Sequence, residues 1–325
     1  MATAKKGLQA PPAHKVVRRG SKRNLRTNLS YLVMLLPGVI VLIINNYIPM
    51  LGVVLPFKEY RYHGGYFSSL FKSAWIGFEN FKFLFSSPNI LQATRNTLLY
   101  NLLFIVLGVV VPVTIAIALT ELLNKRMSRI YQSVYFLPYF LSWIIVSYLA
   151  FSMLSFDNGL INGLLNSLGM DKINWYYELK AWPFIITFFQ MWKYTGYNIV
   201  IYIASLSGIS EEYYEAATLD GATKLQQIRY ITLPMLKTVM IITTLLAVGR
   251  IFNSDFGLFY NVPRNIGALY PATNVIDTLV YVMLKNSNNV GMTAAASFYQ
   301  AVVGCITVFS ANLIVRRIDK DQALF

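Results

Sequence analysis

Residues 210–236 read SEEYYEAATLDGATKLQQIRYITLPML and stand out in a chain that is 56% hydrophobic. The stretch is acidic and rich in alanine at its start, and a glycine and a proline follow. Ser210 suits an N-cap, and Glu211 and Glu212 would lie in a first helical turn, where the helix dipole favours negative charge. Gly221 permits a backbone bend that other residues resist. A short helix followed by a bend is therefore predicted.

A second short helix is predicted from about Lys224 to Ile231. Pro234 suits the first turn of the helix after it, because its missing N–H would be unpaired in that position. The predicted order is helix, bend, helix, and then a longer helix from about residue 235.

The sequence on both sides of this stretch is too apolar for a soluble protein. Mean hydropathy is +0.49, and only 13% of the 325 residues are charged, against about 25% in a typical soluble domain. A membrane-spanning helix needs roughly 20 mostly apolar residues. We therefore predict an all-α integral membrane fold with six transmembrane helices, at about 31–51, 97–120, 133–154, 182–204, 235–256 and 294–315.

The predicted organisation is a basic tail over residues 1–28 and a transmembrane domain over residues 29–325, with residues 210–234 as a loop between the fourth and fifth spans. Lys and Arg are enriched in cytoplasmic segments of membrane proteins. They are more numerous in the tail, the second and fourth loops and the C-terminal end than in the longer remaining loops. Both termini and the loop 210–234 are therefore predicted to be cytoplasmic.

The basic tail could suggest nucleic-acid binding, since the chain carries a net charge of +14. We interpret it as a topology-setting tail beside anionic lipid, and no nucleic acid is expected as a partner.

The residues that commonly hold metals or cofactors are scarce. Cys305 is the only cysteine, the two histidines are His14 and His63, and no GxxxxGK[ST] phosphate loop occurs. No metal and no cofactor are expected in this chain. If ATP drives its function, another chain must bind the nucleotide.

The loop resembles a known family motif. Its fixed positions read E-A-A, three residues, G, nine residues, I-x-L-P: Glu215, Ala216, Ala217, Gly221, Ile231, Leu233 and Pro234. This pattern is similar at every fixed position to the EAA loop of permease subunits of ABC importers. The resemblance implies that the loop forms the coupling helix that docks into a cleft on an ATP-binding subunit.

Further segments resemble the MalF-like sugar permeases, among them WIGFENFKFLF at 75–85 and YFLPYFLSW at 135–143. NYIPMLGVVLPFKEY at 46–60 and SDFGLFYNVPRNIGALYPATNVIDTLVY at 254–281 resemble the LplB-type branch, whose members import oligosaccharides released from complex polysaccharides. The matching segments run from about residue 30 to the C-terminus.

The resemblance implies a type I importer permease of the MetI/MalF-like fold in the bacterial cytoplasmic membrane. Its implied partners are a second homologous permease, an ATP-binding subunit dimer that carries ATP and Mg, an extracytoplasmic solute-binding protein and an oligosaccharide. The chain itself would be a non-catalytic subunit.

Polar residues within predicted spans are functional candidates, because they are costly in lipid. The candidates for a solute pathway are Gln190, Trp192, Lys193, Tyr194, Tyr197, Asn198, Arg250, Asn253 and Asp255. Aromatic faces beside amides and charges suit a sugar, and the two cations favour an acidic one such as a uronate-containing oligosaccharide. In the alternative interpretation, Lys193 snorkels along its apolar stem, and Arg250 pairs with Asp255 or backbone carbonyls to hold helices together.

Two other functions stay open at this point. An ion-gradient-driven secondary transporter of a small solute would often show paired inverted repeats and broken helices, and no clear repeat relates the two halves. A membrane scaffold without transport would form complexes lacking ATP-binding subunits. The intact EAA loop favours the importer over both.

Overall fold

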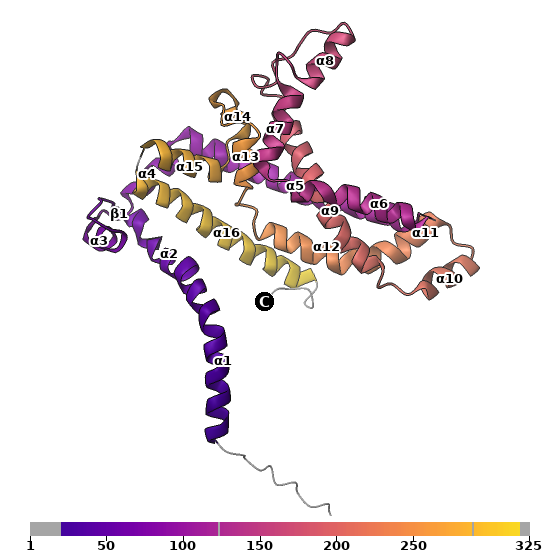
Figure 1. Ribbon diagram of the computed structural model, residues 1–325, viewed down its shortest axis with the longest axis horizontal. Helices are drawn as coiled ribbons and strands as arrows, with labels where there is room; N and C mark the ends of the chain where they lie inside the picture. Colours follow the sequence, from indigo (N-terminus) through magenta and orange to yellow (C-terminus); the bar gives the residue numbers. More distant parts are fainter. Residues whose placement is uncertain (1–20, 123, 288, 319–325) are drawn as a thin grey trace, which may run out of the picture. The chain divides into compact units, whose positions relative to one another are not determined.

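The computed structural model describes residues 21–122, 124–287 and 289–318, and this part of the chain is mostly helical, as the sequence predicts (Figure 1). The first twenty residues of the predicted tail lie outside the described residues. The chain divides into two compact units, Met1–Gly52 and Val53–Phe325.

The described part of the first unit, residues 21–52, is one long helical stretch that is apolar from about Asn28 onward. Helix α1 (Ser21–Leu42) continues through a π turn (Ile43–Tyr47) into α2 (Ile48–Met50). The π turn precedes Pro49, which cannot donate the hydrogen bond that a regular helix needs four residues back. The helical stretch Asn28–Phe57 has 30 residues and is long enough to cross a bilayer.

The second unit begins with a short irregular region. It contains the 3₁₀ turn Leu51–Phe57 that spans the unit boundary, β1 (Lys58–Glu59), α3 (Tyr66–Lys72), β2 (Ala74–Trp75), the 3₁₀ turn Glu79–Phe81 and α4 (Lys82–Ser86). Strands β1 and β2 pair antiparallel, with Lys58 opposite Trp75. The buried Asn80 side chain donates to the carbonyls of Pro56 (2.9 Å) and Lys58 (3.0 Å), which anchors the turn region to β1.

The remaining elements of the second unit are helices. They are α5 (Pro88–Thr120), α6 (Lys125–Phe136), the 3₁₀ turn Leu137–Phe140, α7 (Trp143–Leu154), α8 (Leu160–Ser167), α9 (Trp182–Leu206), α10 (Glu211–Leu219), α11 (Lys224–Gln227), the π turn Ile228–Thr232, α12 (Leu233–Val248), α13 (Phe256–Asn261), the 3₁₀ turn Gly267–Leu269, α14 (Tyr270–Thr273), α15 (Ile276–Ser287) and α16 (Val290–Ile318).

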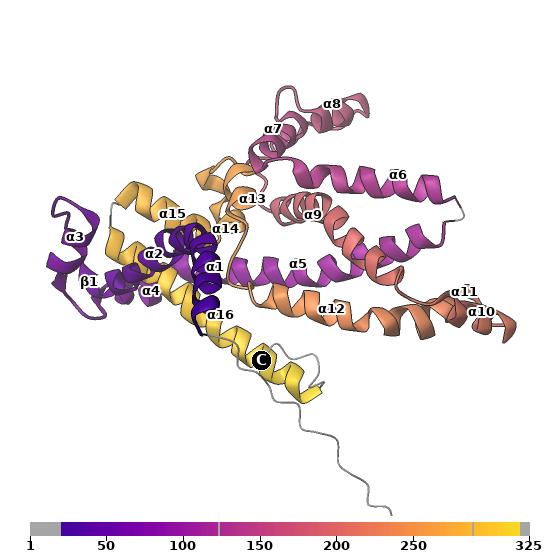
Figure 2. The same ribbon diagram turned by 60° about the horizontal axis from the view of Figure 1, so that its bottom comes forward.

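Helix α9 lies at the centre of this unit. It packs along α5 and α6, and α12 contacts both α5 and α9 (Figure 2). One apolar core surrounds Trp182 and Ile186 of α9, and a second one joins Ile199 and Tyr202 of the same helix to Leu236 of α12. Gly196 allows the close approach to α6, because a Cβ there would overlap the backbone of Tyr135.

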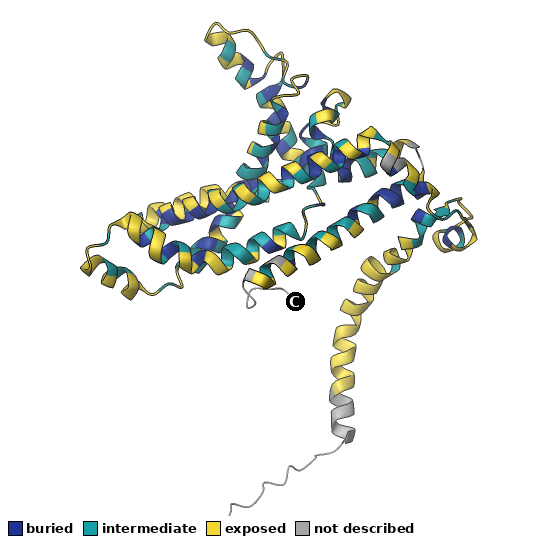
Figure 3. Ribbon diagram, turned by 180° about the vertical axis from the view of Figure 1, so that it is seen from behind, coloured by how far each residue is buried: buried dark blue, intermediate teal, exposed yellow. Residues whose placement is uncertain are grey.

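Outward positions of these helices are apolar as well as exposed. On α5 they include Leu99, Leu102, Val106 and Val110, each more than half exposed. In Figure 3 the exposed positions, in yellow, follow the outer sides of the long helices, while the buried ones gather between helices. An apolar outer surface over helices with internally paired backbones is what a lipid environment requires.

Among the described residues, four helices are long and apolar enough to span a membrane: Asn28–Phe57, Pro88–Thr120, Lys224–Val248 and Val290–Arg317. A fifth is obtained if the bent pair Lys125–Phe140 and Trp143–Leu154 counts as one span. Helix α9 coincides with the expected fourth span and has 25 residues. It is not among these candidates, and the polar residues Gln190, Lys193 and Asn198 interrupt its apolar sequence. The count of six stays a prediction.

Two of the expected spans are less regular than the sequence suggested. The third, expected over 133–154, bends by 101° after Phe140, where Ser142 caps α7 by accepting from the N–H of Ile145 (3.3 Å). The fifth, expected over 235–256, ends as a regular helix at Val248, and an irregular segment connects it to α13.

Candidate functional site

The loop 210–234 forms a helical hairpin at one end of the second unit. Helix α10 starts after Ser210, whose hydroxyl accepts from the N–H of Glu212 (3.4 Å). Glu211 and Glu212 lie in its first turn, as predicted, where the dipole favours them. Of the nine residues of α10, all described, none is buried.

The predicted bend at Gly221 is confirmed. Its φ is +79°, in the left-handed region that glycine adopts without strain. The N–H of Gly221 donates to the carbonyl of Thr218 (3.1 Å), and that of Ala222 donates to the carbonyl of Ala217 (2.9 Å). These two bonds are the Schellman motif, so the bend is a built helix end with its carbonyls satisfied.

A capping box starts the second half of the hairpin. The Thr223 hydroxyl accepts from the N–H of Gln226 (3.4 Å), and the Gln226 side chain accepts from the N–H of Thr223 (2.7 Å). This reciprocal arrangement satisfies two backbone donors at the helix start.

The second short helix, expected from about Lys224 to Ile231, runs on into the next helix instead of ending there. Residues Lys224–Val248 are one continuous helix of 25 residues, with a π turn over Ile228–Thr232. Pro234 has no N–H to donate to the carbonyl of Tyr230. The wider π turn, in which Leu233 donates to Ile228, accommodates this loss without a break. Pro234 therefore lies in the first turn of α12, as predicted, while the helix as a whole begins earlier, at Lys224.

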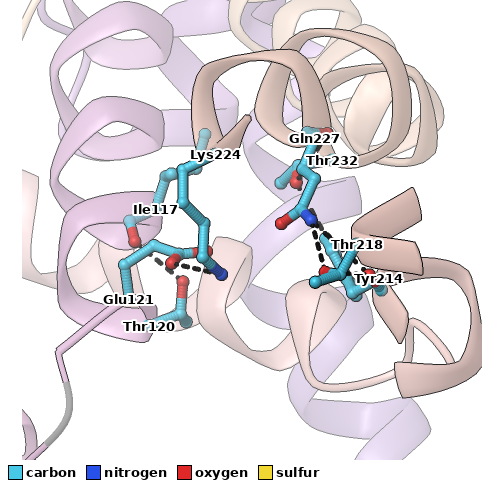
Figure 4. Close-up of polar contacts among 8 residues, drawn as sticks. All are labelled: Ile117, Thr120, Glu121, Tyr214, Thr218, Lys224, Gln227 and Thr232. Carbon is cyan, nitrogen blue, oxygen red and sulfur yellow. Dashed lines mark hydrogen bonds and ion pairs between the residues drawn. The ribbon is translucent and has the colours of Figure 1, made fainter. Parts of the chain in front are cut away.

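A polar link joins α10 to this long helix (Figure 4). The buried Gln227 amide donates to the hydroxyl of Thr218 (2.9 Å) and lies 3.5 Å from the carbonyl of Tyr214. The Tyr214 hydroxyl is 3.0 Å from that of Thr232, which is also buried. Thr218 in turn donates to the Tyr214 carbonyl (2.7 Å). We call Tyr214, Thr218, Gln227 and Thr232 the hairpin link.

A cavity of about 1060 Å³ opens beside the hairpin, between α10 and the adjoining ends of α5, α6 and α9. Charged side chains of both signs line it: Glu121, Lys125, Glu211, Glu215 and Lys224. Lys224 reaches across to Glu121 at the end of α5 (3.1 Å), and both side chains are well exposed. Such an exposed pair contributes little stability, so its charges remain available to another surface.

The seven motif residues lie in two places. Glu215, Ala216 and Gly221 are exposed on α10 and its bend, and Ala217 is partly exposed. Ile231, Leu233 and Pro234 lie on the continuous helix, where Leu233 packs against the core shared by α5, α9 and α12. Leu219 (88% exposed), Leu225 (75%) and Tyr230 (69%) add large apolar side chains to the hairpin surface.

The sequence analysis did not identify the hairpin link or the Lys224–Glu121 pair. The spacing of Tyr214 and Thr218 on one face of a helix was visible, but nothing in the sequence indicates that Gln227 and Thr232 face them. These contacts follow from how tightly the Gly221 bend folds the two helices together.

The pathway candidates are also distributed over different environments. Lys193 is buried and donates to backbone carbonyls of Pro138, Tyr139 and Leu141. Asp255 accepts from the Trp143 indole and the Tyr194 hydroxyl, both at 2.7 Å. These two charged groups are therefore engaged within the chain.

The other candidates are more accessible. Arg250, Asn253 and Tyr197 are exposed, and Gln190, Trp192 and Asn198 are partly exposed. Within the described residues, Arg250 forms no ion pair, so the expected alternative of a pair with Asp255 is not seen.

The segment between α12 and α13 is held by side chains from three other helices. Asn101 of α5 donates to the carbonyl of Ile251 (2.8 Å), and Gln300 of α16 donates to that of Phe252 (2.6 Å). Asp277 of α15 accepts from the N–H of Ser254 (2.7 Å). These side chains thereby satisfy backbone groups that the break leaves without helical partners, which would be costly to bury unpaired.

Within the described part of the chain, no three His, Cys, Asp or Glu side chains gather in a metal-binding arrangement.

A model of a known protein family matches this chain. Residues 108–320 match the family described as "Binding-protein-dependent transport system inner membrane component". The matched range includes the whole hairpin and all pathway candidates.

Two curated relatives match over nearly the full length. Protein LplB of Bacillus subtilis (strain 168) is 30% identical over 288 residues, covering 89% of this chain and 89% of that protein. The polygalacturonan/rhamnogalacturonan transport system permease protein YteP of the same strain is 30% identical over 324 residues, covering 96% and 97%.

A solved structure has the same fold. It is a bacterial ABC transporter involved in the import of the acidic polysaccharide alginate, with a TM-score of 0.82 and 28% identity over 92% of this chain and 99% of that chain. A second structure of a bacterial alginate ABC transporter, in complex with an alginate pentasaccharide-bound periplasmic protein, matches equally well.

Proposed function

Because the chain belongs to the family of binding-protein-dependent transport system inner membrane components, we propose that it is the permease subunit of an ATP-driven oligosaccharide importer, coupled to its ATP-binding subunit through α10. It is a non-catalytic subunit, and ATP hydrolysis takes place on a partner ATPase. Family membership favours ATP over the ion-gradient alternative.

The hairpin supports the proposal because its first helix is exposed while its second helix continues into a long apolar helix. Helix α10 buries none of its residues and presents Leu219 and its neighbours to solvent. The same helix is tied by the hairpin link to a helix that continues without a break to Val248. An exposed surface fixed to a spanning helix can receive a partner and transmit its movement.

The motif residues have matching roles in this proposal. Ala216 and Ala217 allow close approach of the ATP-binding subunit, and Glu215 offers it a charged contact beside the cavity. Gly221 sets the angle of α10. Ile231, Leu233 and Pro234 belong to the helix that receives the movement.

The proposed assembly contains a second homologous permease, an ATP-binding subunit dimer that holds ATP and Mg, and an extracytoplasmic solute-binding protein. The similarity to an alginate transporter solved with its periplasmic protein supports the last of these. The proposed location is the bacterial cytoplasmic membrane, with both termini and the hairpin in the cytoplasm.

The proposed solute is an acidic oligosaccharide. YteP is named for polygalacturonan and rhamnogalacturonan transport, and the structural relative imports alginate. Arg250 supplies an exposed cation without a carboxylate partner among the described residues. The break beside it leaves Asn253 exposed as a hydrogen-bonding neighbour.

Coupling through α10 is tested with two variants of Gly221 in the reconstituted transporter. Asn and Asp both tolerate the left-handed conformation, and a Cβ at this position meets nothing within 4 Å. The two variants therefore differ mainly in charge on the docking surface. We expect Gly221→Asp to assemble in the membrane but lose uptake driven by ATP, and Gly221→Asn to retain more of it. Normal transport by well-expressed Gly221→Asp would refute the proposal.

The solute proposal is tested with Arg250→Gln. A charged hydrogen bond contributes about 1.5–3 kcal/mol, so uptake of a uronate oligosaccharide should fall roughly tenfold or more relative to a neutral one of equal length. An unchanged ratio of acidic to neutral uptake would remove the basis for an acidic solute.

A further inference from the structure

Two of the expected spans contain a break. The first break lies between the 3₁₀ turn Leu137–Phe140 and α7, where the chain turns by 101°. Lys193 of α9 points at this break. Its ammonium donates to the carbonyl of Tyr139 (2.9 Å) and to that of Leu141, and lies 3.5 Å from that of Pro138. A cation is thus placed where helical carbonyls end, which the helix dipole favours.

Aromatic rings surround the same ammonium. Its nitrogen lies 5.3 Å from the ring centre of Trp143 and 5.8 Å from those of Tyr139 and Tyr194. These distances are within the range of cation–π attraction. Lys193 is 6% exposed, so the rings and carbonyls replace the water that a lysine ordinarily keeps.

The second break lies between α12 and α13, and Asp255 is its last residue. One carboxylate oxygen of Asp255 accepts from the N–H groups of Gly257 (2.9 Å) and Leu258 (3.4 Å), which caps α13. The other oxygen accepts from the Trp143 indole and the Tyr194 hydroxyl, both at 2.7 Å.

Trp143 and Tyr194 therefore contact both charged groups. Their ring faces meet the cation of Lys193, and their polar N–H and O–H groups meet the anion of Asp255. The described structure has no direct ion pair between the two charged residues. The Trp143 ring also packs directly against Gly257, where any Cβ would overlap the indole.

We propose that Lys193 is a positioning residue that, through Trp143, Tyr194 and Asp255, holds the break of the third expected span and the break of the fifth as one unit. The two breaks then shift together when the transporter changes state, and Lys193 does not contact the solute. Its charge is balanced by Asp255, which leaves Arg250 as the charge that faces the solute. This inference rests on the proposed transport function.

The alternative is that Lys193 binds the sugar directly. The two roles differ in kinetics, because loss of a solute contact raises the KM for uptake, whereas loss of a linkage between moving segments lowers the maximal rate.

The test is a double-mutant cycle in the complete reconstituted transporter, with uptake measured over a range of solute concentrations. Lys193→Met and Asp255→Asn should each lower the maximal uptake rate by roughly tenfold, with KM within about twofold of the parent value. The double variant should be little worse than either single variant, because the effects of mutations within one network do not add. Lys193→Arg, which retains the cation, should lie between Lys193→Met and the parent.

Two further variants separate linkage from loss of folding. Tyr194→Phe removes only the hydroxyl that reaches Asp255 and should lower the maximal rate in the same direction. Tyr148→Phe, on α7 and 66% exposed, is the matched control and should transport normally.

Three results would overturn the linkage. They are single-variant losses that multiply in the double variant, a raised KM at an unchanged maximal rate for Lys193→Met, and normal uptake by Tyr194→Phe. A parent complex that takes up no oligosaccharide would instead refute the proposed function, so the two failures are distinguishable.

Discussion

Replacing Thr218 with valine should loosen α10 from the helix that continues into the membrane. Valine keeps the shape of threonine but removes the hydroxyl that accepts from the Gln227 amide at 2.9 Å. The remaining contact of that amide, to the carbonyl of Tyr214, is at 3.5 Å and weak. Since Gln227 is 3% exposed, its N–H would be left buried without a good acceptor.

The expected magnitude follows from this geometry. A buried donor left unpaired costs about 1–3 kcal/mol, and about 1.4 kcal/mol corresponds to a tenfold change in an equilibrium. The opening of α10 away from the long helix should therefore become roughly tenfold more frequent. If Gln227 is replaced by leucine as well, both polar partners are gone, and a swap of that kind is close to neutral.

The assay is amide hydrogen exchange of a peptide covering α10 in the purified transporter. Thr218→Val should speed exchange roughly tenfold, while the double variant Thr218→Val/Gln227→Leu should exchange at nearly the parent rate. Thr114→Val is the control, because the exposed Thr114 hydroxyl donates to the carbonyl of Val110 in its own helix and to no other described residue.

Unchanged exchange in Thr218→Val would refute the hairpin link. A double variant that exchanges as fast as Thr218→Val would also contradict the reasoning, since it would show that the unpaired amide was not the cause.

Two further predictions concern packing and pH. Gly196→Ala should lower the free energy of unfolding of the detergent-purified transporter by about 1–3 kcal/mol, because its Cβ would overlap the Tyr135 backbone. Gly163→Ala on α8 is the control, since a Cβ there meets nothing within 4 Å. Equal melting temperatures for the two variants would contradict the close approach of α6 and α9. Burial raises the pKa of Asp277 above its ordinary value of 3.8, against hydrogen bonds from Ser254 and Gln300 that lower it. The folded state therefore favours the protonated form, and the parent should lose stability relative to Asp277→Asn as pH rises above about 4. A difference in melting temperature that stays constant with pH would show that folding does not raise the pKa of Asp277.

The sequence predicted the features that depend on composition or on local backbone preference. Long apolar runs indicated the membrane helices, because a bilayer requires them whatever their neighbours are. Ser210 and Gly221 indicated the start and end of α10, because an N-cap and a left-handed glycine act within one turn of the chain.

The sequence did not predict features that depend on contacts between distant segments. The bend before α7 is stabilised by Lys193, and the irregular segment after Val248 by Asn101, Asp277 and Gln300. These partners are far apart in sequence, and no local pattern pairs them. Pro234 does lie in the first turn of α12, as predicted, but the π turn before it lets the helix run on from Lys224, which no local pattern indicated.

Docking of an ATP-binding subunit on α10 is tested most directly by isolating the protein from native membranes in mild detergent. The co-purifying chains are then identified by mass spectrometry. Leu219→Glu changes a side chain that is 88% exposed on α10, and Leu160→Glu, 61% exposed on α8, is the matched control. We predict that the parent and Leu160→Glu carry an ATP-binding subunit and a second permease, and that Leu219→Glu keeps the second permease but loses the ATP-binding subunit. An ATP-binding subunit equally abundant with Leu219→Glu, or absent from the parent, would contradict the claim.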